Sequence, residues 1–171
     1  KHNVTMNEKK LVIIICVLTA VIFIGGIYVI STTPSTPQVS ASVNAKAYLP
    51  DPTSYDWGTI PMNKGNVAKT FTIKNRGTDT LKLYNVKTSC HCTRAYVTIG
   101  NVESPRFGMD SLSSWTGEVA PGEEGKLTAV FDPAFHGPQG VGPINRFVLV
   151  ETNDKSNAKI TFTLTGTVVR Q

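Results

Sequence analysis

The residues best suited to chemistry are two cysteines separated by one histidine. Cys90, His91 and Cys92 include two of the three cysteines and one of the three histidines of this 171-residue chain. In an extended strand, side chains two positions apart share a face, so the two thiols would lie side by side and His91 would point away. Such a pair can bind one soft metal ion, cycle through a disulfide, or be buried as inert core residues.

A disulfide is the less favoured of these possibilities if the stretch is extended. The Cα atoms of an extended pair lie near the upper limit of about 6.8 Å for a disulfide. A bond between Cys90 and Cys92 is therefore expected only if the chain turns at His91. The same turn would be needed to swing the ring of His91 toward the sulfurs, which makes His91 a reserve ligand.

Two long irregular segments supply further donor atoms. Residues 104–115 contain Met109 and Trp115, and residues 132–143 contain His136. Long irregular connections in a compact domain are more often functional than incidental. Each residue also has an ordinary structural interpretation, because Met109 can fill a gap, Trp115 can pack its loop onto a sheet, and His136 can cap a turn.

Taken together, two thiols, a thioether and an imidazole form a donor set for a soft metal. Thiolate and thioether ligands favour Cu(I), whereas a structural zinc site more often has four cysteine or histidine ligands at familiar spacings. We therefore predict a Cu(I) site formed by Cys90, Cys92, Met109 and His136, with His91 in reserve. If Trp115 lies near such a site, it could shield the cation through a cation–π contact.

Short runs of alternating apolar and polar residues must position these side chains. β-branched and aromatic residues dominate the runs, and no part of the domain has a convincing helical period. About seven short strands predict an all-β fold, an immunoglobulin-like antiparallel sandwich. The expected strands cover residues 55–60, 67–75, 81–88, 96–99, 126–132, 146–152 and 160–169. The expected core residues are Phe71, Ile73, Leu81, Leu83, Leu127, Phe131, Phe147, Leu149, Phe162 and Leu164.

An uncharged apolar run near the N-terminus is long enough, at about 20 residues, to cross a bilayer as a helix. A cleaved signal peptide is less favoured because small-residue cleavage sites lie well beyond the run. Lysines precede the run and the stretch after it is nearly uncharged, so the positive-inside rule places the N-terminus in the cytoplasm. The predicted parts are a cytoplasmic flank (1–10), a transmembrane helix (11–30), a Ser/Thr/Pro-rich tether (31–47) and an extracytoplasmic sandwich (48–171).

Charge and motifs argue against other classes of function. The formal net charge of +5 comes mainly from Lys1, Lys9, Lys10 and Lys46. No basic run interleaved with aromatic residues follows, so a nucleic-acid partner is not expected. The sequence has no nucleophile elbow, metalloprotease motif or P-loop, and we do not expect an enzyme.

Six motifs occur in the order found in one bacterial family. They are YDWGTI at 55–60, FTIKNRG at 71–77, SCHCT at 89–93, APGE at 120–123, VFDP at 130–133 and ETND at 151–154. Over residues 55–169 the chain thereby resembles the DUF1573 family, whose members are immunoglobulin-like and related to major-sperm-protein-type domains. The resemblance implies this fold and a bacterial, extracytoplasmic setting, but no reaction, because the family is functionally uncharacterised. His91 stands where the family commonly has glycine.

The sequence as a whole predicts a single-pass membrane protein whose extracytoplasmic module binds or senses copper. A structural or adhesive sandwich with inert cysteines and an unidentified protein partner is an alternative of another class. A thiol redox protein is the third possibility. It would need a cation to lower the pKa of a thiol, and Lys87 and Arg94 are the local candidates in the sequence.

Overall fold

The chain consists of two units, and each is described by itself. They comprise Lys1–Pro34 and Ser35–Gln171. The computed structural model describes residues 8–32 and 37–170. Most of the predicted cytoplasmic flank and the start of the predicted tether lie outside the described residues.

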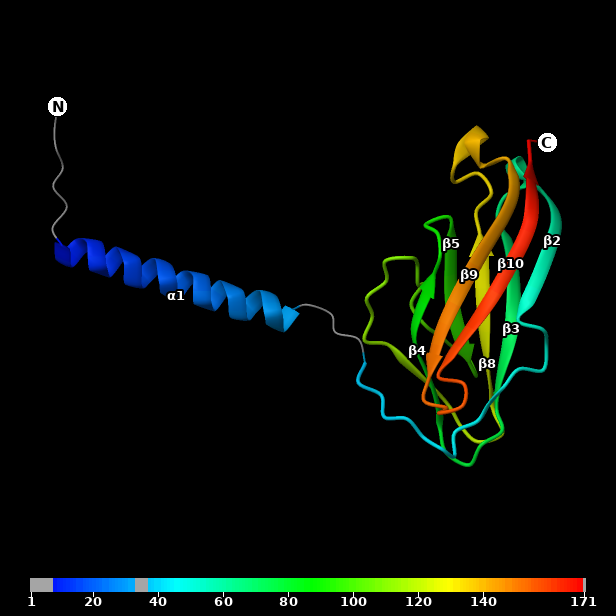
Figure 1. Cartoon of the computed structure of the whole chain (residues 1–171), viewed down its shortest axis with the longest axis horizontal. Helices are drawn as coiled ribbons and strands as arrows, with labels where there is room; N and C mark the ends of the chain where they lie inside the picture. Colours follow the sequence, from blue (N-terminus) through cyan, green and yellow to red (C-terminus); the bar gives the residue numbers. More distant parts are fainter. Residues whose placement is uncertain (1–7, 33–36, 171) are drawn as a thin grey trace. The chain divides into compact units, whose positions relative to one another are not determined.

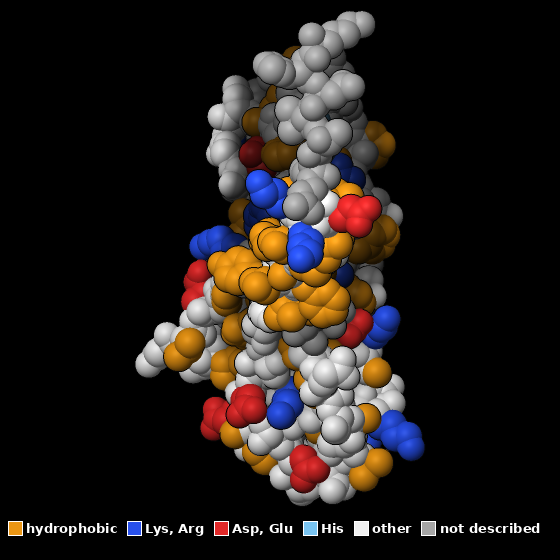
Figure 2. All heavy atoms as spheres, turned by 90° about the vertical axis from the view of Figure 1, so that its left-hand side faces the viewer, with side chains coloured by type: hydrophobic (Ala, Val, Ile, Leu, Met, Phe, Trp, Pro, Cys, Tyr) orange, Lys and Arg blue, Asp and Glu red, His pale blue; other side chains and the backbone are white. Residues whose placement is uncertain are grey.

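The first unit contains one helix, α1 (Glu8–Thr32), of 25 residues. At 1.5 Å per residue it is about 37 Å long, which exceeds the bilayer core of about 30 Å. Its candidate spanning segment has a mean hydropathy of 2.9, and none of its most apolar stretch is buried. In Figure 2, where hydrophobic side chains are orange, those of this helix are exposed. The helix is therefore long and apolar enough to cross a membrane, properties that signal sequences share.

The second unit is a sandwich of two five-stranded sheets (Figure 1), which confirms the predicted all-β fold. One sheet has the strand order β1-β3-β8-β5-β6 and the other has the order β2-β10-β9-β4-β7. The strands are β1 (Ala47–Tyr48), β2 (Ser54–Pro61), β3 (Val67–Asn75), β4 (Leu81–Thr88), β5 (Thr93–Ile99), β6 (Val102–Glu103), β7 (Thr116–Val119), β8 (Glu124–Phe131), β9 (Gly142–Thr152) and β10 (Lys159–Val169). All seven predicted strands are present, and the additional ones are the short edge strands β1, β6 and β7.

One pair of strands departs from the expected antiparallel arrangement. β2 runs parallel to β10, with Ser54 opposite Thr163 and Pro61 opposite Val169. After Pro61 the chain does not form a hairpin but crosses to the other sheet through a short 3₁₀ helix, η1 (Met62–Lys64). Because of this crossover, β2 is free to lie along β10 in the same direction.

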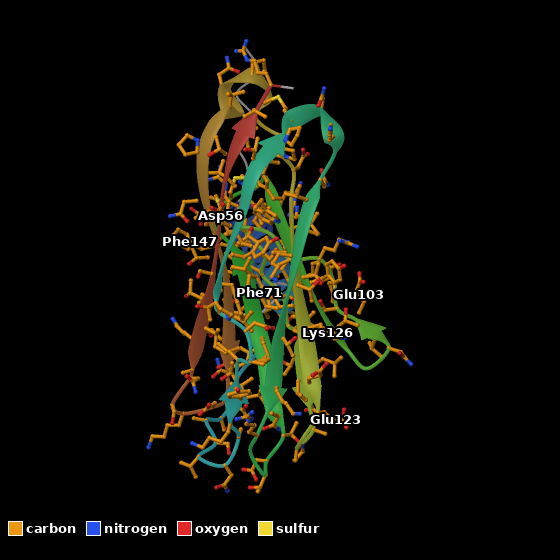
Figure 3. The ribbon with its side chains drawn as sticks, turned by 90° about the vertical axis from the view of Figure 1, so that its right-hand side faces the viewer. Asp56, Phe71, Glu103, Glu123, Lys126 and Phe147 are labelled. Atoms are coloured by element: carbon orange, nitrogen blue, oxygen red, sulfur yellow. A yellow bond between two sulfur atoms is a disulfide. The ribbon has the colours of Figure 1, made fainter. Side chains whose placement is uncertain are left out.

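Side chains from the facing sheets form the core. The rings of Phe71 on β3 and Phe162 on β10 have centroids 4.6 Å apart. Figure 3 shows Phe71 between the two sheets. Eight of the predicted core residues are buried, namely Phe71, Ile73, Leu81, Leu83, Leu127, Phe131, Phe162 and Leu164. The hydrophobic pattern therefore located most of the core correctly.

The prediction was wrong for two residues of β9. Phe147 is 39% exposed and lies on the outer side of the strand, as Figure 3 shows. Leu149 shares this phase and is only partly buried. The inward positions belong to Val148 and Val150, which are fully buried. Successive residues of a strand face opposite sides of the sheet, and in β9 the larger residues, Phe147 and Leu149, are on the outer side.

The segment before β1 is attached to the sandwich. Ser42 donates its backbone N–H to the carbonyl of Asn153 at 2.7 Å and accepts a hydrogen bond from Lys155 N–H at 3.1 Å. Ala45 is fully buried in the core. The last residues of the predicted tether (31–47) are therefore fixed against the domain from Ser42 onward.

Three connections between the sheets lie at one end of the sandwich, which we call the Cys end. They are η1 between β2 and β3, residues 89–92 between β4 and β5, and residues 132–141 between β8 and β9. The pairings of Thr93 and Val67 with Phe131 place the ends of β5, β3 and β8 together. In Figure 1 the connection from β8 to β9 lies at the same end as the C-terminus. The Cys end thus brings residues distant in sequence into one neighbourhood.

Candidate functional site

The cysteine motif forms a tight turn and is not extended. Thr93 donates its backbone N–H to the carbonyl of Cys90 at 3.1 Å. The hydroxyl of Thr88 donates to the carbonyls of Cys90 and Thr93 at 3.1 and 3.0 Å. A turn here allows the chain to pass from β4 in one sheet to β5 in the other. Of the two geometries considered from the sequence, an extended stretch and a turn at His91, the chain therefore adopts the turn.

The turn joins the two cysteines in a disulfide. Cys90 and Cys92 are bonded through their sulfurs, with Cα atoms 5.2 Å apart. This distance is well within the range of about 4.4–6.8 Å for disulfides. The bond that extended geometry disfavoured is formed, because the chain turns at His91.

The two sulfurs have different surroundings. Cys92 is 2% exposed and belongs to a buried cluster with Ile60, Phe131, Ile144 and Val168. Cys90 packs against this cluster but is only partly buried. Its sulfur accepts a hydrogen bond from the backbone N–H of Cys92 at 3.2 Å. A reagent from solution therefore has access to Cys90 and not to Cys92.

His136 approaches the more exposed sulfur. Its Nε2 lies 3.5 Å from Sγ of Cys90. The connection that carries it begins at Asp132, whose backbone N–H donates to the carbonyl of Cys92 at 2.9 Å. Asp132 Oδ1 then accepts from the N–H of Ala134 at 2.9 Å, which turns the chain toward the site. This hydrogen bonding explains how a residue 46 positions from Cys90 reaches its sulfur.

Three of the predicted ligands therefore form one group. The donor atoms of Cys90, Cys92 and His136 all lie within 4.8 Å of one another. His136 is exposed, so the group opens to solvent. Such a group can hold a metal ion once the sulfurs are separate thiolates, because donors of one ion lie within about 4–5 Å of each other.

The other two predicted ligands are placed differently. His91 points to the neighbouring loop, where its Nε2 lies 3.3 Å from Oδ2 of Asp110. Met109 precedes Asp110 and is 39% exposed. The loop is held at the Cys end by a hydrogen bond from Thr88 N–H to the carbonyl of Gly108 at 3.3 Å. The structure thus brings the Met109 loop to this end of the sandwich and directs His91 toward an aspartate.

Sequence reasoning missed Arg146. Its Nε donates to Sγ of Cys92 at 3.2 Å, and its Nη1 donates to the carbonyl of Asn145 at 2.9 Å. Arg146 has the inward phase of β9, between the buried Ile144 and Val148. Among the described residues, no carboxylate forms an ion pair with it. The sequence holds no signal for this contact, since it depends on how β9 pairs with β4.

Met62 is a second residue that the sequence did not single out. It lies in η1 and packs against the cluster that contains Cys92. Trp115, which was considered as a shield for the cation, packs against Phe107, with ring centroids 5.4 Å apart and ring planes tilted by 51°. It also lines a groove with Ile99, the residue of β5 farthest from the cysteine turn. We therefore assign Trp115 no part in the site.

The fold and the site together define an immunoglobulin-like sandwich with a Cys-X-Cys disulfide at one end and one potential transmembrane helix. The family model described as "Protein of unknown function (DUF1573)" matches residues 50–104, which include the cysteine turn. The match covers about a third of the chain and supports the resemblance seen in the sequence motifs. No curated protein matches the sequence.

The chain is also similar to solved structures at low identity, and one of them has a TM-score above 0.5. A protein of unknown function from Porphyromonas gingivalis W83 is 18% identical, with a TM-score of 0.55 over 76% of this chain and 50% of that one. The chain thus spans half the length of that protein. PapD-like domain 7 of human CEP192 is 17% identical, with a TM-score of 0.46 over 82% of this chain and 96% of that one. WR4, a C. elegans MSP family member, is 15% identical, with a TM-score of 0.39 over 75% of this chain and 100% of that one.

Proposed function

We propose that this chain is a membrane-anchored member of the DUF1573 family whose reduced cysteine pair binds one Cu(I) ion. The observation that carries the proposal is the grouping of Cys90, Cys92 and His136 donors within 4.8 Å at an open end of the fold. Two thiolates and one neutral imidazole match the preference of Cu(I) for soft ligands and low coordination number. The module holds copper and has no catalytic role in this proposal.

The distances suit a three-coordinate ion. Bonds of about 2.3 Å to sulfur and about 2.0 Å to nitrogen, taken from zinc sites, place the two donor types of a trigonal ion about 3.7 Å apart. The separation between Cys90 Sγ and His136 Nε2 is 3.5 Å. The same geometry sets the two sulfurs about 4.0 Å apart, so the disulfide must be reduced before the ion binds. Copper and the disulfide therefore exclude each other.

A thioether is the remaining donor in the proposed site. Met109 lies in the loop that is joined to the Cys end through Gly108, and we propose its thioether as a weaker fourth donor beside the three-coordinate set. Met62, which packs against the cluster containing Cys92, is the comparison residue for any test of this ligand. His91 is held 3.3 Å from Asp110 and serves only if that contact breaks.

The proposed location rests on α1. We propose that α1 anchors the chain in the cell membrane of a bacterium, with the N-terminus in the cytoplasm and the sandwich outside. Lys9 and Lys10 at the start of the helix support this orientation through the positive-inside rule. Ligand exchange outside the cytoplasm would allow the module to receive or release copper there.

Copper binding is tested by titrating the reduced full chain in detergent, without oxygen, with Cu(I) against a chromophoric chelator. We expect close to one equivalent to bind, and we expect the double variant Cys90→Ser/Cys92→Ser to bind none. Cys16→Ser is the matched control, because Cys16 is exposed on α1, within the unit that does not contain the group. The oxidised chain should bind no copper. Unchanged binding in the double variant would refute the site.

A further inference from the structure

We propose that the Cys90–Cys92 disulfide exchanges with external thiols, with Cys90 as the attacked sulfur and Cys92 as the leaving group stabilised by Arg146. The activity uses the sulfurs of the proposed copper site but requires no metal. It therefore stands or falls separately from copper binding.

The first observation is the difference in access to the two sulfurs. Cys92 is 2% exposed, whereas Cys90 is partly exposed at the surface of the Cys end. Thiol–disulfide exchange requires a thiolate to reach the sulfur that it attacks. An incoming thiol can therefore bond to Cys90, and the electron pair of the broken bond goes to Cys92.

The second observation is the fixed positive charge at the leaving sulfur. Arg146 Nε lies 3.2 Å from Sγ of Cys92. Arginine remains charged under all ordinary conditions, and charge-assisted hydrogen bonds are about twice as strong as neutral ones. A half-buried arginine that faces a neutral disulfide gains a better partner when that sulfur becomes a thiolate. The contact therefore favours departure of Cys92.

The surroundings of Arg146 support its proposed role in stabilising a thiolate at Cys92. Burying a charge is unfavourable unless it is paired or hydrogen-bonded. In the described part of the chain, the guanidinium donates only to the sulfur of Cys92 and to the carbonyl of Asn145, and its carbon lies 5.8 Å from the ring centre of Phe131. A thiolate at Cys92 would be the anion that this charge otherwise lacks.

The exchange balances as two displacements. In the first, an external thiolate attacks Sγ of Cys90, a new disulfide forms between them, and Cys92 leaves as a thiolate beside Arg146. In the second, another external thiolate attacks the external sulfur of that mixed disulfide, and Cys90 leaves as a thiolate. The external thiols lose two electrons and form their own disulfide, while Cys90 and Cys92 are reduced. The external thiols release two protons to the solvent, and each cysteine thiolate either keeps its charge, as Cys92 does beside Arg146, or takes up one of these protons.

The test uses glutathione as the thiol and the oxidised full chain in detergent, with Cys16→Ser as background and a metal chelator present. Acid-quenched samples are alkylated, and the modified cysteine is located by peptide fragmentation in a mass spectrometer. We expect the mixed disulfide on Cys90. The single variants test the same point in reverse, because glutathione disulfide should modify Cys90 in the Cys92→Ser variant much faster than Cys92 in the Cys90→Ser variant.

The role of Arg146 is tested by the rate of reduction. Arg146→Met keeps an apolar stem but removes the charge, and we expect reduction to slow about tenfold, the factor for one lost charge-assisted hydrogen bond. Arg146→Lys should recover part of the rate, which a purely structural role would not predict. Arg94→Met is the matched control, because Arg94 is exposed on β5 and has no contact with either sulfur among the described residues. Thermal unfolding of each variant shows whether the fold is retained.

The possible outcomes separate the two proposals. Adducts mainly on Cys92, or equal rates for Arg146→Met and Arg94→Met, would overturn the exchange mechanism. A disulfide that resists glutathione would also overturn it, even if the chain binds Cu(I) after stronger reduction. Rapid exchange at Cys90 in a chain that binds no Cu(I) would support the exchange and refute only the copper site.

Discussion

Asp154 provides a test of how the end of the sandwich opposite the Cys end is stabilised. Its carboxylate is fully buried and accepts hydrogen bonds from Ala47 N–H at 3.0 Å, Ser156 N–H at 2.8 Å and the Asn157 side chain at 2.9 Å. Lys46 Nζ lies 4.0 Å from its Oδ1. One side chain thus joins the start of β1 to the turn between β9 and β10. Asp154→Asn keeps the shape but replaces one acceptor with an amide donor.

The expected loss follows from these partners. A hydrogen bond to a charged group contributes about 1.5–3 kcal/mol, and a buried donor left without a partner costs about 1–3 kcal/mol. At least one of the three donors would face the new amide group instead of an oxygen. We therefore expect Asp154→Asn to lower the free energy of unfolding by about 2–4 kcal/mol near neutral pH.

The direction in which this stability difference changes with pH can also be predicted. Burial by itself would raise the pKa of Asp154, but hydrogen bonds from Asn157, Ser156 and Ala47 and the charge of Lys46 together lower it below its ordinary value. A lowered pKa in the folded chain means that the stabilisation is present above the unfolded value of about 3.9 and is lost as the pH falls through the folded pKa. The difference between wild type and Asp154→Asn should therefore shrink in acid.

The assay is urea unfolding, followed by tryptophan fluorescence, of a fragment that begins at Ser35. Asp51→Asn is the control, because Asp51 is exposed and a surface substitution should change stability by no more than about 0.5 kcal/mol. A difference for Asp154→Asn below about 1 kcal/mol at pH 7, or one that stays constant down to acid, would contradict the reasoning.

Three further predictions concern the site, the topology and the domain boundary. His136→Ala should weaken Cu(I) binding by about tenfold or more, measured by chelator competition, while His91→Ala should change it little because His91 faces Asp110. Equal effects of the two changes would argue against His136 as a ligand. Protease added to spheroplasts should remove the sandwich, and a domain protected until the membrane is permeabilised would show the opposite orientation. A fragment beginning at Ala47 should unfold at lower urea than one beginning at Ser35, because it lacks the buried Ala45 and the Ser42 hydrogen bonds; equal midpoints would mean that these contacts add no stability.

The alternation of apolar and polar residues was enough to predict most of the sandwich. It was not enough to predict which side chains of β9 face inward. In β3, for example, Phe71, Thr72, Ile73 and Lys74 alternate between apolar and polar residues, so the inward face can be identified from the sequence. β9 contains Phe147, Val148, Leu149 and Val150 in succession, and both phases of this run are apolar. The choice between them was made by pairing with β4 and β10, which is not visible in a single strand.

Only those parts of the candidate site could be predicted whose chemistry follows from the type of residue alone. Cysteine, histidine and methionine were recognised as soft donors, and the prediction that His136 lies near the cysteines was correct. The turn at residues 89–92 could be named only as one of two possibilities, because it results from the crossover between sheets. Arg146 was missed for a similar reason, since its contact with Cys92 joins residues 54 positions apart.

The two proposed properties of the cysteine pair are linked by one geometric fact. A Cu(I) ion needs two separate thiolates, and the structure shows the same two sulfurs joined in a bond. If both proposals hold, copper can bind only after that bond is reduced, and exchange at Cys90 is one route to the reduced pair. Arg146 favours the opened state by pairing with Cys92, whereas the same charge disfavours a second cation nearby. A thiolate shared between Arg146 and copper would bind the ion less tightly than a free one, so the proposed copper site predicts a releasable ion and not permanent storage.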